Sequence, residues 1–207
     1  PETKLMVKRL GGINLQKELV PVRPAMHRPI GGIQTDVNGA TTLSGLYAAG
    51  ESACVGVHGA NRLGGNSLLE STVFGRRAGE SAASHAKNAS SEKVSESLLK
   101  EQETRIKELS SKNTDEDTIG SVRRELAQTM HEQVGLYRDS QSLQSALNKI
   151  EELKSRYQRV GIPSVDGAYN PSLSILLELE NMLDVAHVIV ASAMDREESR
   201  GSHYRND

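Results

Sequence analysis

Residues 58–70 combine side chains and glycines that suit ligand binding. The segment reads His-Gly-Ala-Asn-Arg-Leu-Gly-Gly-Asn-Ser-Leu-Leu-Glu and continues into an apolar run. Its glycines let the backbone approach a ligand closely, and the guanidinium of Arg62 could bind a carboxylate through two hydrogen bonds. A helix that begins near Ser67 would add free N–H groups and a positive dipole end. The segment therefore predicts a loop and helix start that bind an anionic or electron-rich group.

Three more residues are candidates for the same site, and each also has a structural interpretation. Glu51 follows an apolar run, where a buried strand would place a carboxylate at a sheet edge that can bind ribose or ribityl hydroxyls. Taken alone, Glu51 is more often an exposed turn acid. His27 and His58 can each hydrogen-bond an anion or simply cap a turn, and Arg62 can equally form a structural salt bridge.

Several other chemistries lack support in the sequence. No His, Asp and Glu set has metal-ligand spacing, and no nucleophile elbow, phosphate loop or G-x-G-x-x-G fingerprint is present. Cys54 is the single cysteine, so we expect a small buried hydrophobic residue. The formal charge of −2 gives no electrostatic case for nucleic acid or an anionic membrane. The most apolar segment, 173–194, carries too many polar residues for a membrane span.

The elements that must position these residues fall into two parts, and the predicted fold class is α+β. In the first part we expect a short strand near Ile33, an Asn-Gly hairpin turn at 36–39, and a buried strand at 43–49. A helix over 67–86 would begin with a capping box formed by Ser67 and Glu70. This part predicts an incomplete α/β segment.

Helical periodicity dominates after residue 88, which predicts an antiparallel helical bundle. A fourth helix over 173–196 is apolar on nearly all sides and should be the buried member. The predicted domains are 1–88 and 89–207. Three earlier helices show apolar faces at spacings of three or four residues or their sums, formed by Val94, Leu98, Ile106 and Leu109, by Ile119, Val122, Leu126 and Met130, and by Leu143, Leu147, Ile150, Leu153 and Tyr157.

A family resemblance covers nearly the whole chain. The chain resembles the flavoprotein subunit of succinate dehydrogenase and fumarate reductase, and the 58–70 string is its most specific motif. In this resemblance, 1–88 is the C-terminal part of the FAD-binding domain and 89–207 is the helical C-terminal domain. The motifs that carry it are residues 21–27, 31–33, 45–51, 58–70, 73–76, 135–138, 192–194 and 196–205.

The resemblance implies site residues, a cofactor and partners. Glu51 matches an FAD contact, and Ser67 and Leu68 match the backbone contact to the isoalloxazine ring. Arg62 and His27 match groups that hold a C4 dicarboxylate substrate. The implied reaction is hydride transfer between FAD and succinate or fumarate, with electrons passed to an iron–sulfur subunit. No nucleic acid partner is implied.

The resemblance also implies a location and a missing part. The subunit would be cytoplasmic or lie on the cytoplasmic face of the membrane, which it would meet only through partner subunits. The proton-transferring arginine and the glycine fingerprint belong to segments upstream of Pro1, so we expect a C-terminal portion that is inactive alone. One departure is Arg28, because the family often has an aromatic residue after the substrate histidine.

The sequence leaves two alternatives open. L-Aspartate oxidase shares the histidine, the Gly-Ala-Asn-Arg segment and the helical domain, although residues 63–65 favour the dehydrogenase and reductase branch. The isolated chain could also be only a structural and subunit-contact module, as the missing G-x-G-x-x-G fingerprint would allow.

Overall fold

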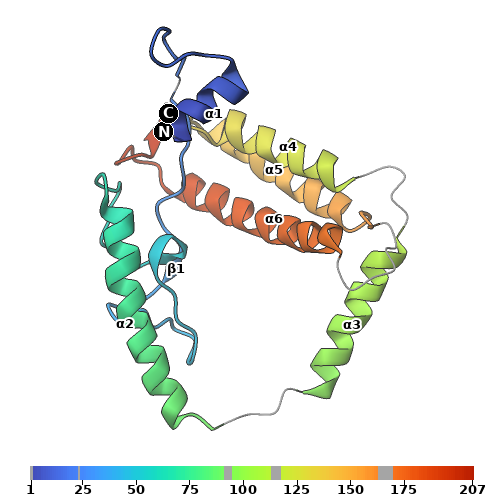
Figure 1. The fold of residues 1–207 in the computed structure, drawn as a ribbon. Helices are drawn as coiled ribbons and strands as arrows, with labels where there is room; N and C mark the ends of the chain where they lie inside the picture. Colours follow the sequence, from blue (N-terminus) through green and yellow to red (C-terminus); the bar gives the residue numbers. More distant parts are fainter. Residues whose placement is uncertain (1, 23, 91–94, 113–117, 163–169) are drawn as a thin grey trace.

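Helices make up most of the regular structure in the computed structural model of this chain (Figure 1), which describes residues 2–22, 24–90, 95–112, 118–162 and 170–207. The strands are two residues long and form two separate parallel pairs, β1 with β2 and β3 with β4. The expected α+β class is confirmed, with helices dominating the fold. The elements are α1 (Glu2–Gly11), β1 (Ile33–Gln34), the 3-10 helix η1 (Gly50–Ser52), β2 (Ala53–Cys54), α2 (Asn66–Asn88), α3 (Glu96–Ser111), α4 (Ile119–Gln133), β3 (Tyr137–Arg138), α5 (Ser140–Tyr157), α6 (Pro171–Asp195) and β4 (Tyr204–Arg205).

The hydrophobic core lies between α4, α5 and α6, which run side by side in alternating directions (Figure 1). The predicted apolar face of α5 is confirmed, since Leu143, Ile150 and Leu153 are fully buried. Helix α6 is the central member, with Leu176, Leu179 and Leu183 among its buried residues. Each such side chain contributes about 1.5–3 kcal/mol through removal from water. The bundle therefore supplies most of the apolar burial.

Side chains cap the N-termini of all three core helices. Thr118 and Ser121 form a reciprocal capping box at α4, and the carboxylate of Asp139 accepts from the backbone N–H of Ser142 at α5. Asn170 caps α6 immediately before Pro171, where proline fits the first helical turn. These caps fix where each helix begins, because they satisfy N–H groups that have no partner inside the helix.

Helix α3 departs from the predicted four-helix bundle. Leu98 and Ile106 from its predicted apolar face are 56% and 41% exposed, and Leu109 is the one buried residue of this fully described helix. Val94, predicted on the same face, lies outside the described residues, as does Arg23 of the 21–27 motif. Figure 1 shows α3 extending away from the bundle. The apolar periodicity correctly predicted a helix here. The expectation that α3 packs within the bundle was wrong.

The segment between β1 and α2 also differs from expectation. Residues 43–49 form a turn and a single antiparallel bridge between Ala40 and Tyr47, so the predicted buried strand is absent from this described stretch. The Asn-Gly turn is present, but β1 pairs in parallel with β2, so the turn does not join two paired strands of a hairpin. Cys54 is exposed in β2, where we expected a buried residue.

Gly39 allows this turn to pack closely against α2. Its φ is +76°, and a Cβ built there would lie 2.4 Å from the Cβ of Ala78 in α2. A glycine is therefore required both by the backbone conformation and by the close approach of α2. This contact places the turn and the following η1, which carries Glu51, against the helix.

Candidate functional site

The first turn of α2 is the centre of the candidate site. Gly65 occupies the N-cap position with φ +83° and provides no side-chain cap. The predicted capping box of Ser67 and Glu70 is therefore wrong, because both side chains bond to residues outside the helix. The positive end of the helix dipole nevertheless lies here, as expected for a site that binds an electron-rich group.

Arg28 brings two of the predicted site residues together. Its guanidinium donates to the hydroxyl of Ser67 and forms an ion pair with Glu51. The Arg28 side chain is 13% exposed, whereas that of Glu51 is 61% exposed. Glu51 lies in η1 rather than after a strand. A serine hydroxyl, a carboxylate and a guanidinium thus converge at the start of α2.

Arg28 also retains an unused donor. Its Nε atom is buried and has no hydrogen-bond partner among the residues that the structure describes. A buried N–H group without an acceptor destabilises a protein by roughly 1–3 kcal/mol. Binding of a ligand that supplies an acceptor to this Nε would therefore be favoured. The sequence marked Arg28 only by its difference from the aromatic residue common in the family, and that difference was the available signal.

His58 and Glu70 anchor the glycine-rich loop to α2. The His58 Nε2 atom lies 2.7 Å from Oε2 of Glu70, and the two side chains are 12% and 3% exposed. Because His58 begins the loop and Glu70 belongs to α2, this contact fixes the loop on the helix. His58 thus makes a structural contact through Nε2, whereas its buried Nδ1 has no hydrogen-bond partner among the described residues.

The two predicted substrate-binding residues are close in sequence to residues that make these contacts. His27 is exposed and directly precedes Arg28, and Arg62 is half-buried in the loop between His58 and α2. Across the described residues, no hydrogen bond or ion pair joins His27 to Arg62. Leu68, the remaining predicted cofactor contact, is 77% exposed at the start of α2. The structure thus brings Glu51 and Ser67 together through Arg28, and does not bring His27 and Arg62 into contact.

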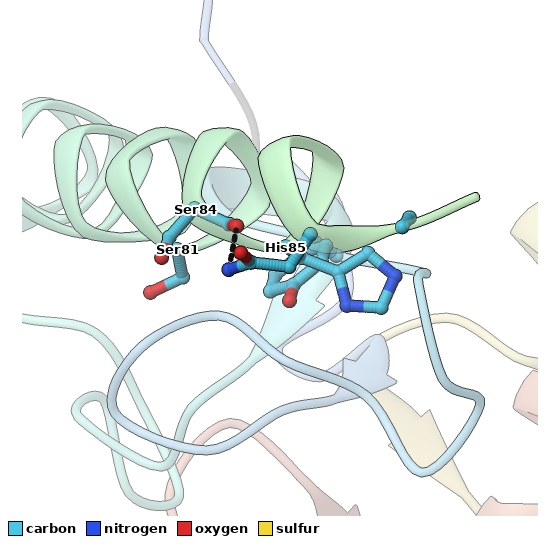
Figure 2. A pocket seen from close by; sticks show the side chains of 6 residues that line it. Ser81, Ser84 and His85 are labelled. Atoms are coloured by element: carbon cyan, nitrogen blue, oxygen red, sulfur yellow. Dashed lines mark hydrogen bonds between the residues drawn. The ribbon is translucent and has the colours of Figure 1, made fainter. Parts of the chain in front are cut away.

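A shallow hollow near the other end of α2 is separate from this site. Figure 2 shows Ser81, Ser84 and His85 lining it, and a hydrogen bond from the amide of Asn88 to the Ser84 carbonyl crosses it. Ser67 and His85 are 18 residues apart on one helix, which corresponds to about 27 Å at 1.5 Å per residue. The hollow therefore cannot share a small ligand with Ser67.

Comparisons with known proteins identify the family. Residues 123–207 match a family model described as Fumarate reductase flavoprotein C-term, and residues 2–68 match one described as FAD binding domain. A fumarate reductase flavoprotein subunit from Mycobacterium tuberculosis is 46% identical over 196 residues, which is 92% of this chain and 34% of that protein. The chain belongs to the family of fumarate reductase and succinate dehydrogenase flavoprotein subunits. This is a family of FAD-dependent oxidoreductases.

Further members of the family agree with this assignment. The fumarate reductase flavoprotein subunit of Haemophilus influenzae is 43% identical over 198 residues, covering 95% of this chain and 33% of that protein. A solved quinol fumarate reductase from Escherichia coli matches with a TM-score of 0.90 and 40% identity, over 100% of this chain and 36% of its own. The chain thus spans about a third of the length of these relatives. The aspartate oxidase alternative is not favoured.

No helix within the described residues is both long and apolar enough to cross a membrane. The solved relatives include a quinol fumarate reductase from Escherichia coli and an Sdh1 complex from Mycobacterium smegmatis.

Proposed function

We propose that this chain supplies part of the FAD and dicarboxylate site of an enzyme that interconverts succinate and fumarate. The observation that carries the proposal is the convergence of Arg28, Ser67 and Glu51 at the start of α2, directly before which lies the loop that bears Arg62. The family assignment supplies the class of cofactor and reaction. Substitutions of Arg62 and Glu51 test the roles of individual residues.

Ser67, Leu68 and Glu51 are the residues proposed to hold FAD. Ser67 and Leu68 lie at the positive end of α2, which stabilises negative charge on a bound ring. The Leu68 N–H already donates to the carbonyl of Gly65 at 3.2 Å, so a flavin would have to share or replace that bond. Glu51 has an exposed carboxylate that can accept hydrogen bonds from ribityl or ribose hydroxyls. The unpartnered Nε of Arg28 fits an acceptor atom in the same place. Bound FAD would supply a two-electron hydride donor and acceptor.

Arg62 and His27 are the residues proposed to hold the dicarboxylate. The guanidinium of Arg62 can bind one carboxylate through two parallel N–H donors, which fixes the orientation as well as the position of the substrate. His27 can donate a further hydrogen bond to the same anion. Both residues neighbour the proposed flavin contacts in sequence, since His27 precedes Arg28 and Arg62 precedes Ser67 by five residues.

We also propose a separate role for each of the two parts of the chain. Residues 1–88 would complete an FAD-binding domain, and residues 89–207 would form the helical domain, one charged face of which would contact an iron–sulfur subunit. The protein would lie on the cytoplasmic side and reach the membrane through partner subunits. The polar outer faces of α4 and α5, which carry ion pairs such as Glu125 with Arg156, are compatible with either a partner or solvent.

Replacement of Arg62 in the full-length holoprotein tests the substrate assignment. Arg62→Lys keeps the charge but removes the planar fork, so kcat/KM for fumarate should fall at least ~30-fold, corresponding to about 2 kcal/mol of lost binding. Arg76→Lys is the matched control, because Arg76 is 81% exposed and pairs only along α2 with Glu80 among the described residues. Equal activity of the two variants would refute the role of Arg62.

Replacement of Glu51 tests the proposed contact with FAD. Glu51→Gln retains the size of the side chain but weakens its acceptor strength, so the dissociation constant for FAD should rise while the helical bundle stays folded. Absorbance of the bound flavin after gel filtration measures this directly. An unchanged flavin content and dissociation constant would remove Glu51 from the site.

A further inference from the structure

We propose that Gly201 and Ser202 are positioning residues that hold the Arg62 loop in its binding geometry by contact with the backbone at Ala60. The proposal deepens the proposed function, because it rests on Arg62 as the carboxylate-binding residue. It links the end of the helical bundle to the substrate loop, although the two are far apart in sequence.

The contact joins backbone to backbone. The Ser202 N–H donates to the carbonyl oxygen of Ala60 at 3.3 Å. A Cβ at Gly201 would lie 2.1 Å from that oxygen and 2.7 Å from the Ala60 Cβ, and Gly201 has φ +62°. A side chain at position 201 therefore could not be accommodated by a rotamer change, and the loop itself would have to move. Ala60 is two residues before Arg62.

The segment that makes this contact is rigidly held. Arg200 and His203 exchange two backbone hydrogen bonds of 2.8 and 3.1 Å, which close a tight turn around Gly201 and Ser202. Both residues of the turn that contact the loop are thereby fixed relative to His203.

His203 is anchored to the bundle through both ring nitrogens. Nη1 of Arg138 donates to Nδ1 of His203 at 2.8 Å, and Nε2 of His203 donates to the carbonyl of Arg196 at 2.9 Å. This pattern requires the neutral ring with its proton on Nε2. Burial lowers the pKa of His203 and so favours the same neutral form. Arg138 lies in β3 between α4 and α5, and Arg196 follows α6.

The loop is thus held at two points on the N-terminal side of Arg62. His58 is fixed to α2 through Glu70, and Ala60 is fixed to the 200–203 turn. Because binding depends on the placement of the guanidinium within roughly an ångström, displacement at Ala60 should weaken dicarboxylate binding. Flavin binding at α2 should be spared, since no contact of Arg28 involves this turn among the described residues.

The test uses Gly201→Ala in the full-length holoprotein, with Gly12→Ala as the matched control. Gly12 has a similar φ of +67°, but a Cβ there would meet nothing within 4 Å. We expect the dissociation constant for malonate, a dicarboxylate that cannot be reduced, to rise about tenfold or more in Gly201→Ala with the FAD content unchanged. The control should bind malonate within about twofold of the unsubstituted protein.

Hydrogen exchange of the loop amides separates this proposal from the proposed function. Amides in residues 58–63 should exchange faster in Gly201→Ala than in the control, whether or not malonate binds. If the unsubstituted protein also fails to bind malonate, faster exchange in Gly201→Ala would refute the proposed function and support the loop contact. Unchanged exchange and unchanged malonate binding would overturn the positioning role.

A second variant, His203→Asn, tests the same contact in case the Gly201→Ala protein does not fold. His203→Asn shortens the side chain and breaks its contact with Arg138, but it adds no bulk at Ala60. The same amides should exchange faster and malonate should bind more weakly, with the FAD content again unchanged. If His203→Asn leaves both measurements unchanged, the anchored turn does not position the loop.

Discussion

Replacing Glu70 with alanine tests whether the glycine-rich loop is pinned to α2. The substitution removes a 2.7 Å hydrogen bond between largely buried side chains and leaves the ring of His58 without that partner. A buried polar group that loses its partner costs about 1–3 kcal/mol. We therefore expect Glu70→Ala to lower the free energy of unfolding by about 2 kcal/mol. Since each kcal/mol shifts Tm by roughly 2–4 °C in a domain of this size, Tm should fall by about 4–8 °C.

Urea unfolding followed by circular dichroism measures this loss, and α2 itself offers a control. Glu80→Ala also removes an acidic residue from the helix, but Glu80 is 64% exposed and pairs with an arginine that is 81% exposed. Exposed pairs of this kind contribute about 0.3–0.5 kcal/mol. Glu70→Gln keeps an acceptor and should lie between the two. If Glu70→Ala and Glu80→Ala prove equally stable, the His58–Glu70 contact does not hold the loop.

Two further predictions concern the acid stability of the bundle and the seating of the turn before η1. The hydrogen bond from Arg156, followed by that from Lys149, lowers the pKa of Glu125 to about 2. Its stabilisation is therefore present above the ordinary pKa near 4.5 and is lost as the pH falls towards 2. Because the side chain is 35% exposed, screening leaves roughly 1 kcal/mol, and acid titration of Glu125→Gln should show a correspondingly smaller loss of stability. Gly39→Ala should lower Tm more than Gly12→Ala, because both have positive φ but only position 39 meets a neighbour, at 2.4 Å; equal Tm values would contradict this packing.

The helical core could be predicted from sequence because its apolar spacing is local information. Leu143, Ile150 and Leu153 recur at intervals that place them on one face of a helix, and all three are buried in α5. The continuous apolar character of α6 likewise indicated its central position. In both cases the partner surface is formed by neighbouring helices in the same part of the chain.

Helix α3 shows that apolar periodicity does not predict whether the apolar face of a helix is buried. Leu98 and Leu109 share a predicted face, but the first is 56% exposed and the second is buried. The spacing predicts that a helix has an apolar side, whereas burial depends on which segment covers that side. The apolar run at 43–49 failed as a strand for a related reason, because its turn and single bridge depend on pairing geometry rather than on hydrophobicity.

The sequence indicated candidate site residues but not the contacts that the structure shows between them. Glu51 and Ser67 were chosen from local motifs, but Arg28 joins them from a position 39 residues before Ser67. Local spacing assigned Glu70 to a capping box, and the structure assigns it to His58. Long-range partners override local patterns here, because a buried side chain satisfies whichever polar atom the fold brings nearest.

The pairing of β3 with β4 constrains the order in which this molecule can mature during synthesis. Tyr137 and Arg138 find their partners only when residues 204 and 205 have left the ribosome, and the turn at 200–203 reaches Ala60 only then. The intervening helices can pack earlier, since their contacts are more local. A nascent chain would thus hold a folded bundle and an unattached loop at residues 58–63 at the same time. The contact that fixes Ala60 would therefore form only after the bundle helices have been synthesised.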